Sequence, residues 1–139
     1  MGIGPSHIEK ANFEDIQNAI ENNNIIINTL LHSEQKCLIK NTHNSHNEEH
    51  IINELFNKKD FSKIIFIYGK NSNDYSAYEK FFQLQKMGFT KIFLYIGGLF
   101  EWLCLQDIYG TDNFPTTSQE LDIYKYRPQS SLQMKHITN

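Results

Sequence analysis

The feature that most constrains the fold is a pair of short apolar runs that lack the alternation of a half-exposed strand. Ile25 to Leu31 is interrupted only by Asn28 and Thr29, and Lys63 to Tyr68 (KIIFIY) is apolar after its first residue. A strand with one face in water alternates polar and apolar residues, whereas a strand covered on both faces is apolar throughout. Parallel sheets with helices on both faces contain such strands, so the two runs predict an α/β fold.

Segments with helical periodicity lie around the two runs. Phe13 to Glu21 has apolar residues on one side, and Tyr75 to Met87 does the same before Gly88, a residue type that ends helices in the left-handed conformation. A further helix is predicted from about His46 to Asn57, because Ser45 and Glu48 have the spacing of a capping box. Apolar residues also predict a helix over 100–108.

Two more segments are predicted to be strands. Lys91 to Ile96 is a strong candidate that ends at Gly97 and Gly98, and Cys37 to Lys40 is a shorter one. The regular change between strand and helix predicts an open α/β sheet with helices on both faces. We expect residues 1–12 to be an N-terminal tail, 13–110 to be one domain, and 111–139 to be an extension that packs on the domain or trails from it.

Composition excludes several classes of function. The 139 residues carry 13 Lys and Arg against 16 Asp and Glu, so the chain lacks the basic surface that nucleic acid requires. No apolar run approaches the ~20 residues of a membrane span, so we expect no membrane partner and a cytoplasmic protein. Frequent Asn, Ile and Lys are typical of AT-rich genomes, including those of giant viruses, in which case the location would be host cytoplasm or virion.

The candidate functional site is the loop that follows the second apolar run. Gly69, Lys70, Asn71, Ser72, Asn73 and Asp74 separate the end of a buried strand from the start of a helix. In α/β proteins this junction commonly holds a catalytic or anion-binding loop. The loop contains no cysteine, histidine or arginine, and therefore offers no obvious nucleophile.

From Phe13 to Gly110 the order of these elements resembles a single rhodanese-like domain. The most specific part is Ile64 to Trp102, in which strand, loop, helix, strand, Gly-Gly and a downstream tryptophan follow one another at the family's spacing. The resemblance implies a mainly parallel five-stranded sheet. It also implies a catalytic cysteine at the first position of the loop, in active members, and commonly a basic residue at its last position.

The resemblance places Gly69 at the cysteine position and Asp74 at the basic position. Without a thiol no persulfide can form, and a carboxylate at the start of a helix repels the anion that the loop would hold. We therefore expect a catalytically inactive domain that acts as a protein-binding or structural module, with no cofactor. Its partner surface is expected to be the loop or the segment from Phe114 to Pro128.

Two alternatives remain open at this point. Cys37 or Cys104 could support residual sulfurtransferase or phosphatase chemistry in a remodelled site, although both lie among apolar neighbours typical of core thiols. The loop 69–74 could instead bind a small anion through its backbone amides, with Lys70 compensating for Asp74. His43, His46 and His50 are close in sequence, but an exposed helix face explains them better than a metal site, and we expect no metal.

Overall fold

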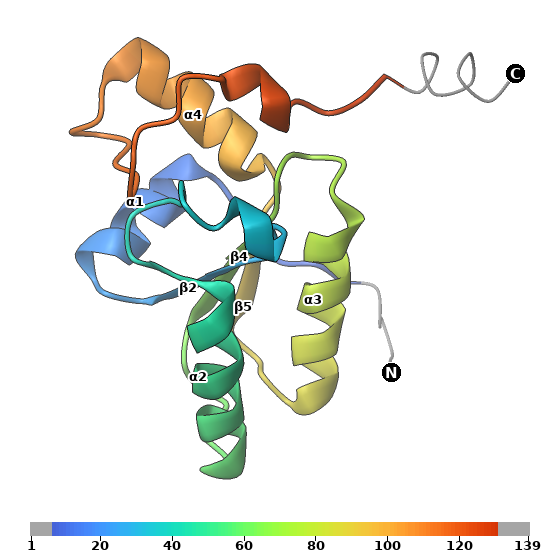
Figure 1. Cartoon of the computed structure of the whole chain (residues 1–139). Helices are drawn as coiled ribbons and strands as arrows, with labels where there is room; N and C mark the ends of the chain where they lie inside the picture. The colour runs from blue at the N-terminus through green and yellow to red at the C-terminus, as the bar shows by residue number, and fades with distance from the viewer. Residues whose placement is uncertain (1–6, 131–139) are drawn as a thin grey trace, which may run out of the picture.

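The computed structural model describes residues 7–130, and these form one five-stranded sheet between two layers of helices (Figure 1). The strand order is β1-β5-β4-β2-β3 and every pairing is parallel. The prediction of an α/β fold with a five-stranded sheet is therefore confirmed. The strands are β1 (Lys10–Ala11), β2 (Ile25–Asn28), β3 (Thr42–His43), β4 (Ile65–Tyr68) and β5 (Ile92–Tyr95).

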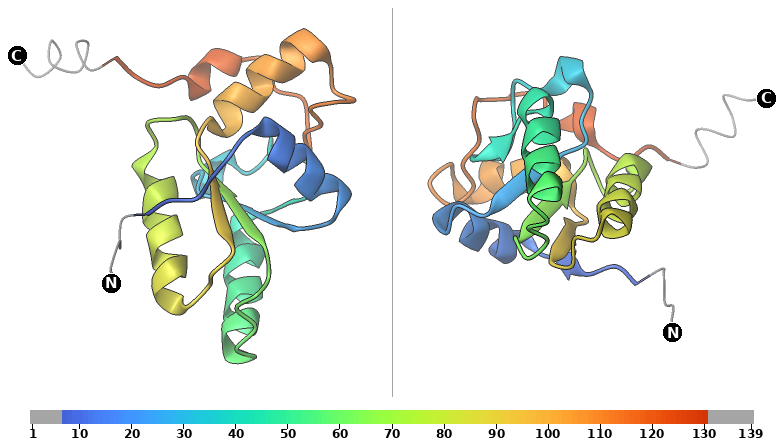
Figure 2. Two further views of the ribbon diagram at one scale, coloured as in Figure 1. Left: turned by 180° about the vertical axis from the view of Figure 1, so that it is seen from behind. Right: turned by 90° about the horizontal axis from the view of Figure 1, so that it is seen from below.

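The four α-helices lie in pairs on the two faces of the sheet. They are α1 (Phe13–Glu21), α2 (Ser45–Asn57), α3 (Tyr75–Met87) and α4 (Gly98–Tyr109), and two 3-10 helices, η1 (His32–Glu34) and η2 (Ile123–Tyr126), follow β2 and α4. Buried residues of α1 and α4 share one apolar cluster, whereas those of α2 and α3 share the other. Figure 2 shows this arrangement from behind and from below.

The two apolar runs form the centre of the sheet because burial on both faces selects apolar residues at every position. All four residues of β4 are buried, and β4 pairs with β2 on one side and β5 on the other. At the end of β4, Tyr68 is fully buried, and its hydroxyl accepts a hydrogen bond from Ile39 N at 3.0 Å and shares one with Thr42 Oγ1 at 2.9 Å. Burial raises the pKa of this hydroxyl. These two hydrogen bonds attach residues 39–42, which lead into β3, to the central strand β4.

The outer strands differ from the sequence prediction. β1 lies at Lys10–Ala11, inside the predicted N-terminal tail, and pairs with β5. The predicted strand at Cys37 to Lys40 is wrong: the apolar residues there are buried, but only Ile39 forms an isolated bridge, with Thr116, and the strand is Thr42–His43. The apolar character of this stretch thus reflects burial rather than strand pairing.

The helices α1, α2 and α3 each begin at a residue whose polar side chain caps the helix, and for α2 this residue is not the predicted one. α2 is capped by Asn44, whose side chain accepts from Asn47 N, and Ser45 is already the first helical residue. The predicted capping box of Ser45 and Glu48 is therefore wrong. The Glu48 side chain instead pairs with Lys80 on α3. α3 is capped by Asp74 and ends at Gly88, which has φ 113° as predicted for a left-handed end.

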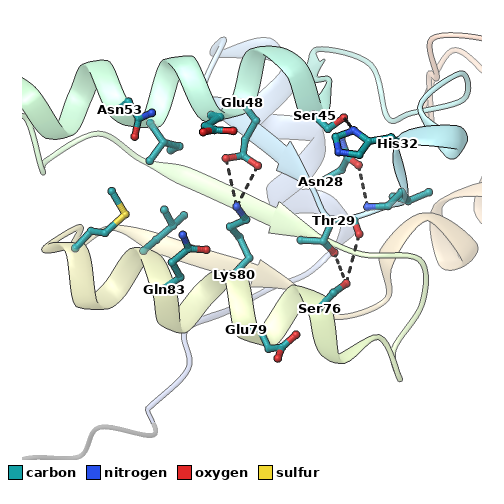
Figure 3. A pocket seen from close by; sticks show the side chains of 15 residues that line it. Asn28, Thr29, His32, Ser45, Glu48, Asn53, Ser76, Glu79, Lys80 and Gln83 are labelled. Atoms are coloured by element: carbon teal, nitrogen blue, oxygen red, sulfur yellow. Dashed lines mark hydrogen bonds and ion pairs between the residues drawn. The ribbon is translucent and has the colours of Figure 1, made fainter.

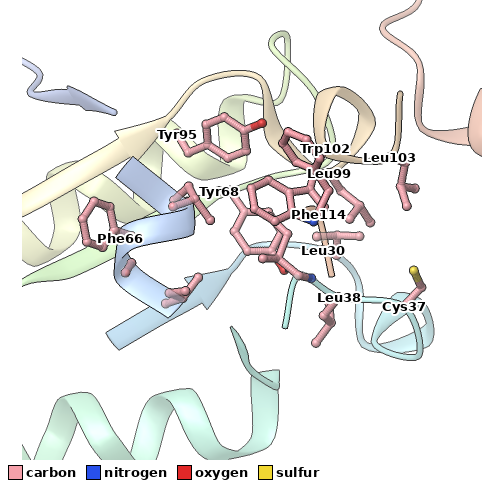
Figure 4. Packing of buried hydrophobic residues seen from close by; sticks show 14 of the residues in the cluster. Leu30, Cys37, Leu38, Phe66, Tyr68, Tyr95, Leu99, Trp102, Leu103 and Phe114 are labelled. Carbon is pink, nitrogen blue, oxygen red and sulfur yellow. The ribbon is translucent and has the colours of Figure 1, made fainter. Parts of the chain in front are cut away.

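The described part of the C-terminal extension packs on the domain. Phe114 and Tyr126 are buried, and Figure 4 shows Phe114 in the cluster with Trp102, Tyr68 and Leu99. The Trp102 indole donates to Pro115 O at 3.1 Å. Residues 111–130 thus complete the core on the α1 and α4 face, while 1–6 and 131–139 of the predicted tail and extension lie outside the described residues.

Within residues 7–130, none of the helices combines the length and the hydropathy that a bilayer crossing requires.

Candidate functional site

The predicted loop lies at the carboxyl end of the central strand β4, where ligands of open α/β sheets usually bind. Its backbone is held by the start of α4: Leu99 N donates to Gly69 O at 3.0 Å and Phe100 N donates to Lys70 O at 2.9 Å. Gly98 permits this approach, because a Cβ there would lie 2.6 Å from Gly69 O and its φ is 68°. Backbone hydrogen bonds therefore hold the loop against the start of α4, and the loop leads directly into α3.

The Asp74 side chain fills the interior of the loop. Its Oδ2 accepts a hydrogen bond from Lys70 N at 2.7 Å, and its Oδ1 accepts from Ser76 N at 3.0 Å and from Ser76 Oγ at 2.5 Å. A Cβ built on Gly69 would lie 2.4 Å from Asp74 Oδ2. The carboxylate thus takes the place where a side chain at position 69 would project, and it uses a backbone amide of the loop.

The other polar residues of the loop are used in structural contacts or face solvent. Lys70 Nζ pairs with Glu34 Oε2 at 2.9 Å, and therefore does not offset the charge of Asp74. Asn71 Nδ2 donates to Tyr126 O at 2.8 Å, and Asn71 Oδ1 accepts from Asn73 N at 2.9 Å. Ser72 and Asn73 are exposed. All six predicted residues lie together, but their arrangement is that of a closed, capped turn.

Beside the loop is a hollow of about 580 Å³ with two exposed apolar side chains at its rim. Leu31 is 64% exposed and Tyr75 is 80% exposed, and both line the hollow together with the Lys70 and Glu34 pair. Sequence reasoning placed these two residues in a strand and a helix and did not assign them to a surface. Their exposure depends on how the loops at the end of the sheet are arranged, which periodicity does not report.

Neither cysteine belongs to the loop. Cys37 is buried, its Sγ donates to Ser118 O at 3.4 Å, and burial raises the pKa of its thiol. Cys104, on α4, is half-buried, and its thiol pKa is raised by burial and then by the negative charges of Asp107 and Glu101. Both thiols are therefore protonated near neutral pH, which makes them poor nucleophiles.

The three histidines that are close in sequence differ in exposure. His46 and His50 are exposed on α2, whereas His43 on β3 is half-buried and burial lowers its pKa. His32 Nδ1 shares a hydrogen bond with Ser45 Oγ at 2.7 Å. Across residues 7–130, no three His, Cys, Asp or Glu side chains are grouped so as to hold a metal ion.

The fold and the position of this loop define a class, and a family model identifies it. The model for the rhodanese-like domain matches residues 9–104, which is most of the chain. The chain belongs to the rhodanese-like domain family. The match begins within the predicted tail, in agreement with the place of β1 in the sheet.

Solved structures with the same fold are distant in sequence. Ygr203w from Saccharomyces cerevisiae, described as a homologue of single-domain rhodanese and of the Cdc25 phosphatase catalytic domain, is 10% identical with a TM-score of 0.62, and the alignment covers 91% of this chain and 97% of that one. The Alr3790 protein from Anabaena is 17% identical, with a TM-score of 0.56 and coverage of 83% and 97%. BH2092 from Bacillus halodurans is 15% identical, with a TM-score of 0.56 and coverage of 86% and 90%.

At these identities the likeness establishes the fold alone. No curated protein matches the chain.

Proposed function

We propose that this rhodanese-like domain has no sulfurtransferase or phosphatase activity and acts as a protein-binding module. The observation that carries the proposal is the side chain of Asp74, whose carboxylate occupies the loop and accepts from Lys70 N at 2.7 Å, directly against Gly69. A rhodanese mechanism needs a thiolate at this point, and a phosphatase of the same type needs the loop amides free for phosphate. Gly69 offers no thiol, and the Asp74 carboxylate already occupies Lys70 N, so both observations support inactivity.

The two alternatives receive less support from the geometry. A thiol-based reaction at Cys37 or Cys104 would have to use thiols whose pKa values are raised by burial. Binding of a small anion would place it against the Asp74 carboxylate, and Lys70 is engaged by Glu34. A protein-binding role, in contrast, is supported by Leu31 and Tyr75, which expose apolar surface at the rim of the loop.

The test of inactivity is a pair of assays on the purified chain. Sulfur transfer from thiosulfate to cyanide and hydrolysis of p-nitrophenyl phosphate are both expected at the rate of buffer alone. Turnover above buffer that disappears in Cys37→Ser or Cys104→Ser would instead establish the thiol-based alternative. Turnover that survives both changes would overturn the whole argument from the loop.

The binding role is tested with two matched double variants. Leu31→Ser with Tyr75→Ser removes the apolar rim of the loop, whereas Leu121→Ser with Tyr124→Ser removes two similarly exposed residues of the C-terminal segment. Partners retained from a lysate of the native source by the unaltered chain should be lost with the first variant and kept with the second. The reverse pattern would move the partner surface to the C-terminal segment.

A further inference from the structure

The hollow beside the loop 69–74 is lined in part by polar groups that pair with one another. Ser76 Oγ shares a hydrogen bond with Thr29 Oγ1 at 2.9 Å, and Figure 3 shows the two side chains facing each other. Lys70 Nζ pairs with Glu34 Oε2 at 2.9 Å. The Asp74 carboxylate accepts hydrogen bonds from Lys70 N and Ser76 N. An occupant of the hollow therefore gains little from charge, since the charged side chains of the lining are already engaged.

The apolar side chains at the rim of the hollow, in contrast, are open to solvent. Leu31, just before η1, is 64% exposed, and Tyr75, the first residue of α3, is 80% exposed. An occupant can reach both side chains from outside the molecule. Covering them removes apolar surface from water, which favours binding. The occupant that complements this apolar rim therefore presents apolar side chains of its own.

The chain itself runs along the edge of the hollow before the described residues end. Tyr126 is buried, and the side chain of Asn71 in the loop donates a hydrogen bond to its carbonyl oxygen at 2.8 Å. Further along the chain, Gln129 is part of the lining of the hollow. The described part ends at Ser130. The residues that follow are therefore attached within reach of the apolar rim.

The sequence after this point supplies apolar side chains. Residues 131–139, which lie outside the described residues, read SLQMKHITN. Leu132 and Met134 are two positions apart, and in an extended segment such residues face the same side. Leu132 is about 10 Å from Gln129 along an extended chain. Attachment so close to the hollow gives the segment an effective concentration in the mM range, at which a weak apolar contact suffices for occupancy.

We propose that residues 131–139 of the same chain bind in the hollow beside the loop and compete there with a partner protein. Leu132 and Met134 cover the apolar rim and shield it from water. The inference rests on the proposed protein-binding function and adds a regulation of that site, since a partner must displace the segment before it can contact Leu31 and Tyr75.

The first test compares backbone amide signals of the isotopically labelled full chain and of two variants by nuclear magnetic resonance. Leu132→Ser with Met134→Ser should shift the signals of the two rim residues, because the segment leaves the hollow. The matched control, Gln133→Ser with Lys135→Ser, changes the interleaved positions of the same segment and should leave those signals in place. Unchanged rim signals in the first variant, or equal shifts in both variants, would refute the proposal.

The second test adds a synthetic peptide of residues 131–139 to the labelled proteins. A segment at an effective concentration of about 4 mM, with a dissociation constant of about 1 mM, leaves the hollow free in about one fifth of the molecules. The peptide should therefore bind the variant Leu132→Ser with Met134→Ser about fivefold more tightly than the unaltered chain. Leu31→Ser with Tyr75→Ser should abolish binding of the peptide.

Two results of the second test would overturn the proposal. Equal affinity of the peptide for the variant and for the unaltered chain would mean that the chain's own segment does not compete. Rim signals of the unaltered chain that change with protein concentration would assign the occupant to the segment of a second copy, and would exclude binding within one chain.

The outcome is separable from that of the proposed function. Neither test contains a partner protein, so an absence of binding by the segment refutes the regulation and leaves the lysate comparison and the two activity assays unaffected. Loss of support in those experiments would remove the proposed partner, whereas the contact between the segment and the rim is measured directly by the amide signals.

Discussion

The interaction between position 69 and Asp74 can be measured with a double-mutant cycle. Gly69→Ala adds a Cβ that would lie 2.4 Å from Asp74 Oδ2 and 2.9 Å from its Cγ. Gly69 is not among the residues with positive φ, so alanine meets no backbone penalty and the effect is steric. To make room, the carboxylate must leave the hydrogen bonds to Lys70 N and Ser76 N and the cap of α3.

The magnitude follows from what the carboxylate loses. A helix cap contributes about 1 kcal/mol, and a hydrogen bond to a charged group contributes about 1.5–3 kcal/mol. Gly69→Ala should therefore lower the free energy of unfolding by about 3 kcal/mol, because the overpacking and the lost hydrogen bonds act together. Asp74→Ala alone loses the same hydrogen bonds without the clash, which amounts to about 2 kcal/mol.

The double variant distinguishes this reasoning from simple additivity. When Asp74 is already alanine, the new Cβ at position 69 meets mainly Thr29 Oγ1 at 3.0 Å, and a small rotation can relieve that contact. The two changes together should cost about 2–3 kcal/mol instead of about 5 kcal/mol, a coupling of about 2 kcal/mol. Urea denaturation followed by circular dichroism measures all four proteins. Additivity within about 0.5 kcal/mol would mean that Asp74 does not fill the space beside Gly69.

Three further predictions concern the rest of the molecule. Phe114→Ala should lower the free energy of unfolding by about 3–5 kcal/mol in urea, as for a core aromatic, although this residue lies beyond the family match; a loss below 1 kcal/mol would show that the C-terminal segment is dispensable. Tyr68→Phe should cost about 1–3 kcal/mol in the same assay, since Ile39 N loses its acceptor in a buried place, and an unchanged midpoint would contradict this. For Cys104, the rate of alkylation by iodoacetamide in Cys37→Ser protein should reach half its maximum above pH 9.0, because burial favours the neutral thiol; a midpoint below the ordinary thiol value would refute the raised pKa.

The central elements could be predicted from sequence because burial on both faces leaves a direct pattern. Ile25 to Leu31 and Lys63 to Tyr68 are apolar because helices cover both sides of β2 and β4, and the helices between them are amphipathic because only one side meets the sheet. The outer strands β1 and β3 have two residues each, too few to show any period. The stretch around Ile39 misled the prediction because its burial comes from the C-terminal segment, a contact distant in sequence.

The candidate site was predictable in its residues but not in its geometry. A run of Asn, Ser and Asp before a helix indicates a turn and a cap, and Asp74 is indeed the cap of α3. Sequence could not indicate that the same carboxylate reaches back to Lys70 N, since this depends on the loop conformation. The ion pair between Glu48 on α2 and Lys80 on α3 was missed for a related reason: both residues look like surface charges until the sheet brings the two helices side by side.

Gly69 and Asp74 form one structural unit, because the Asp74 carboxylate lies where a Cβ at position 69 would project. A loop that binds an anion leaves its amides solvated until the ligand arrives, whereas here an internal carboxylate satisfies Lys70 N permanently. The loop therefore keeps its shape without a ligand, on the condition that position 69 has no side chain. Gly69→Cys by itself would set the new thiol against a fixed negative charge, which raises a thiol pKa and opposes catalysis. If the domain is inactive as proposed, Gly69→Cys alone should therefore give no sulfur transfer, whereas the same change made together with Asp74→Ala removes the opposing charge.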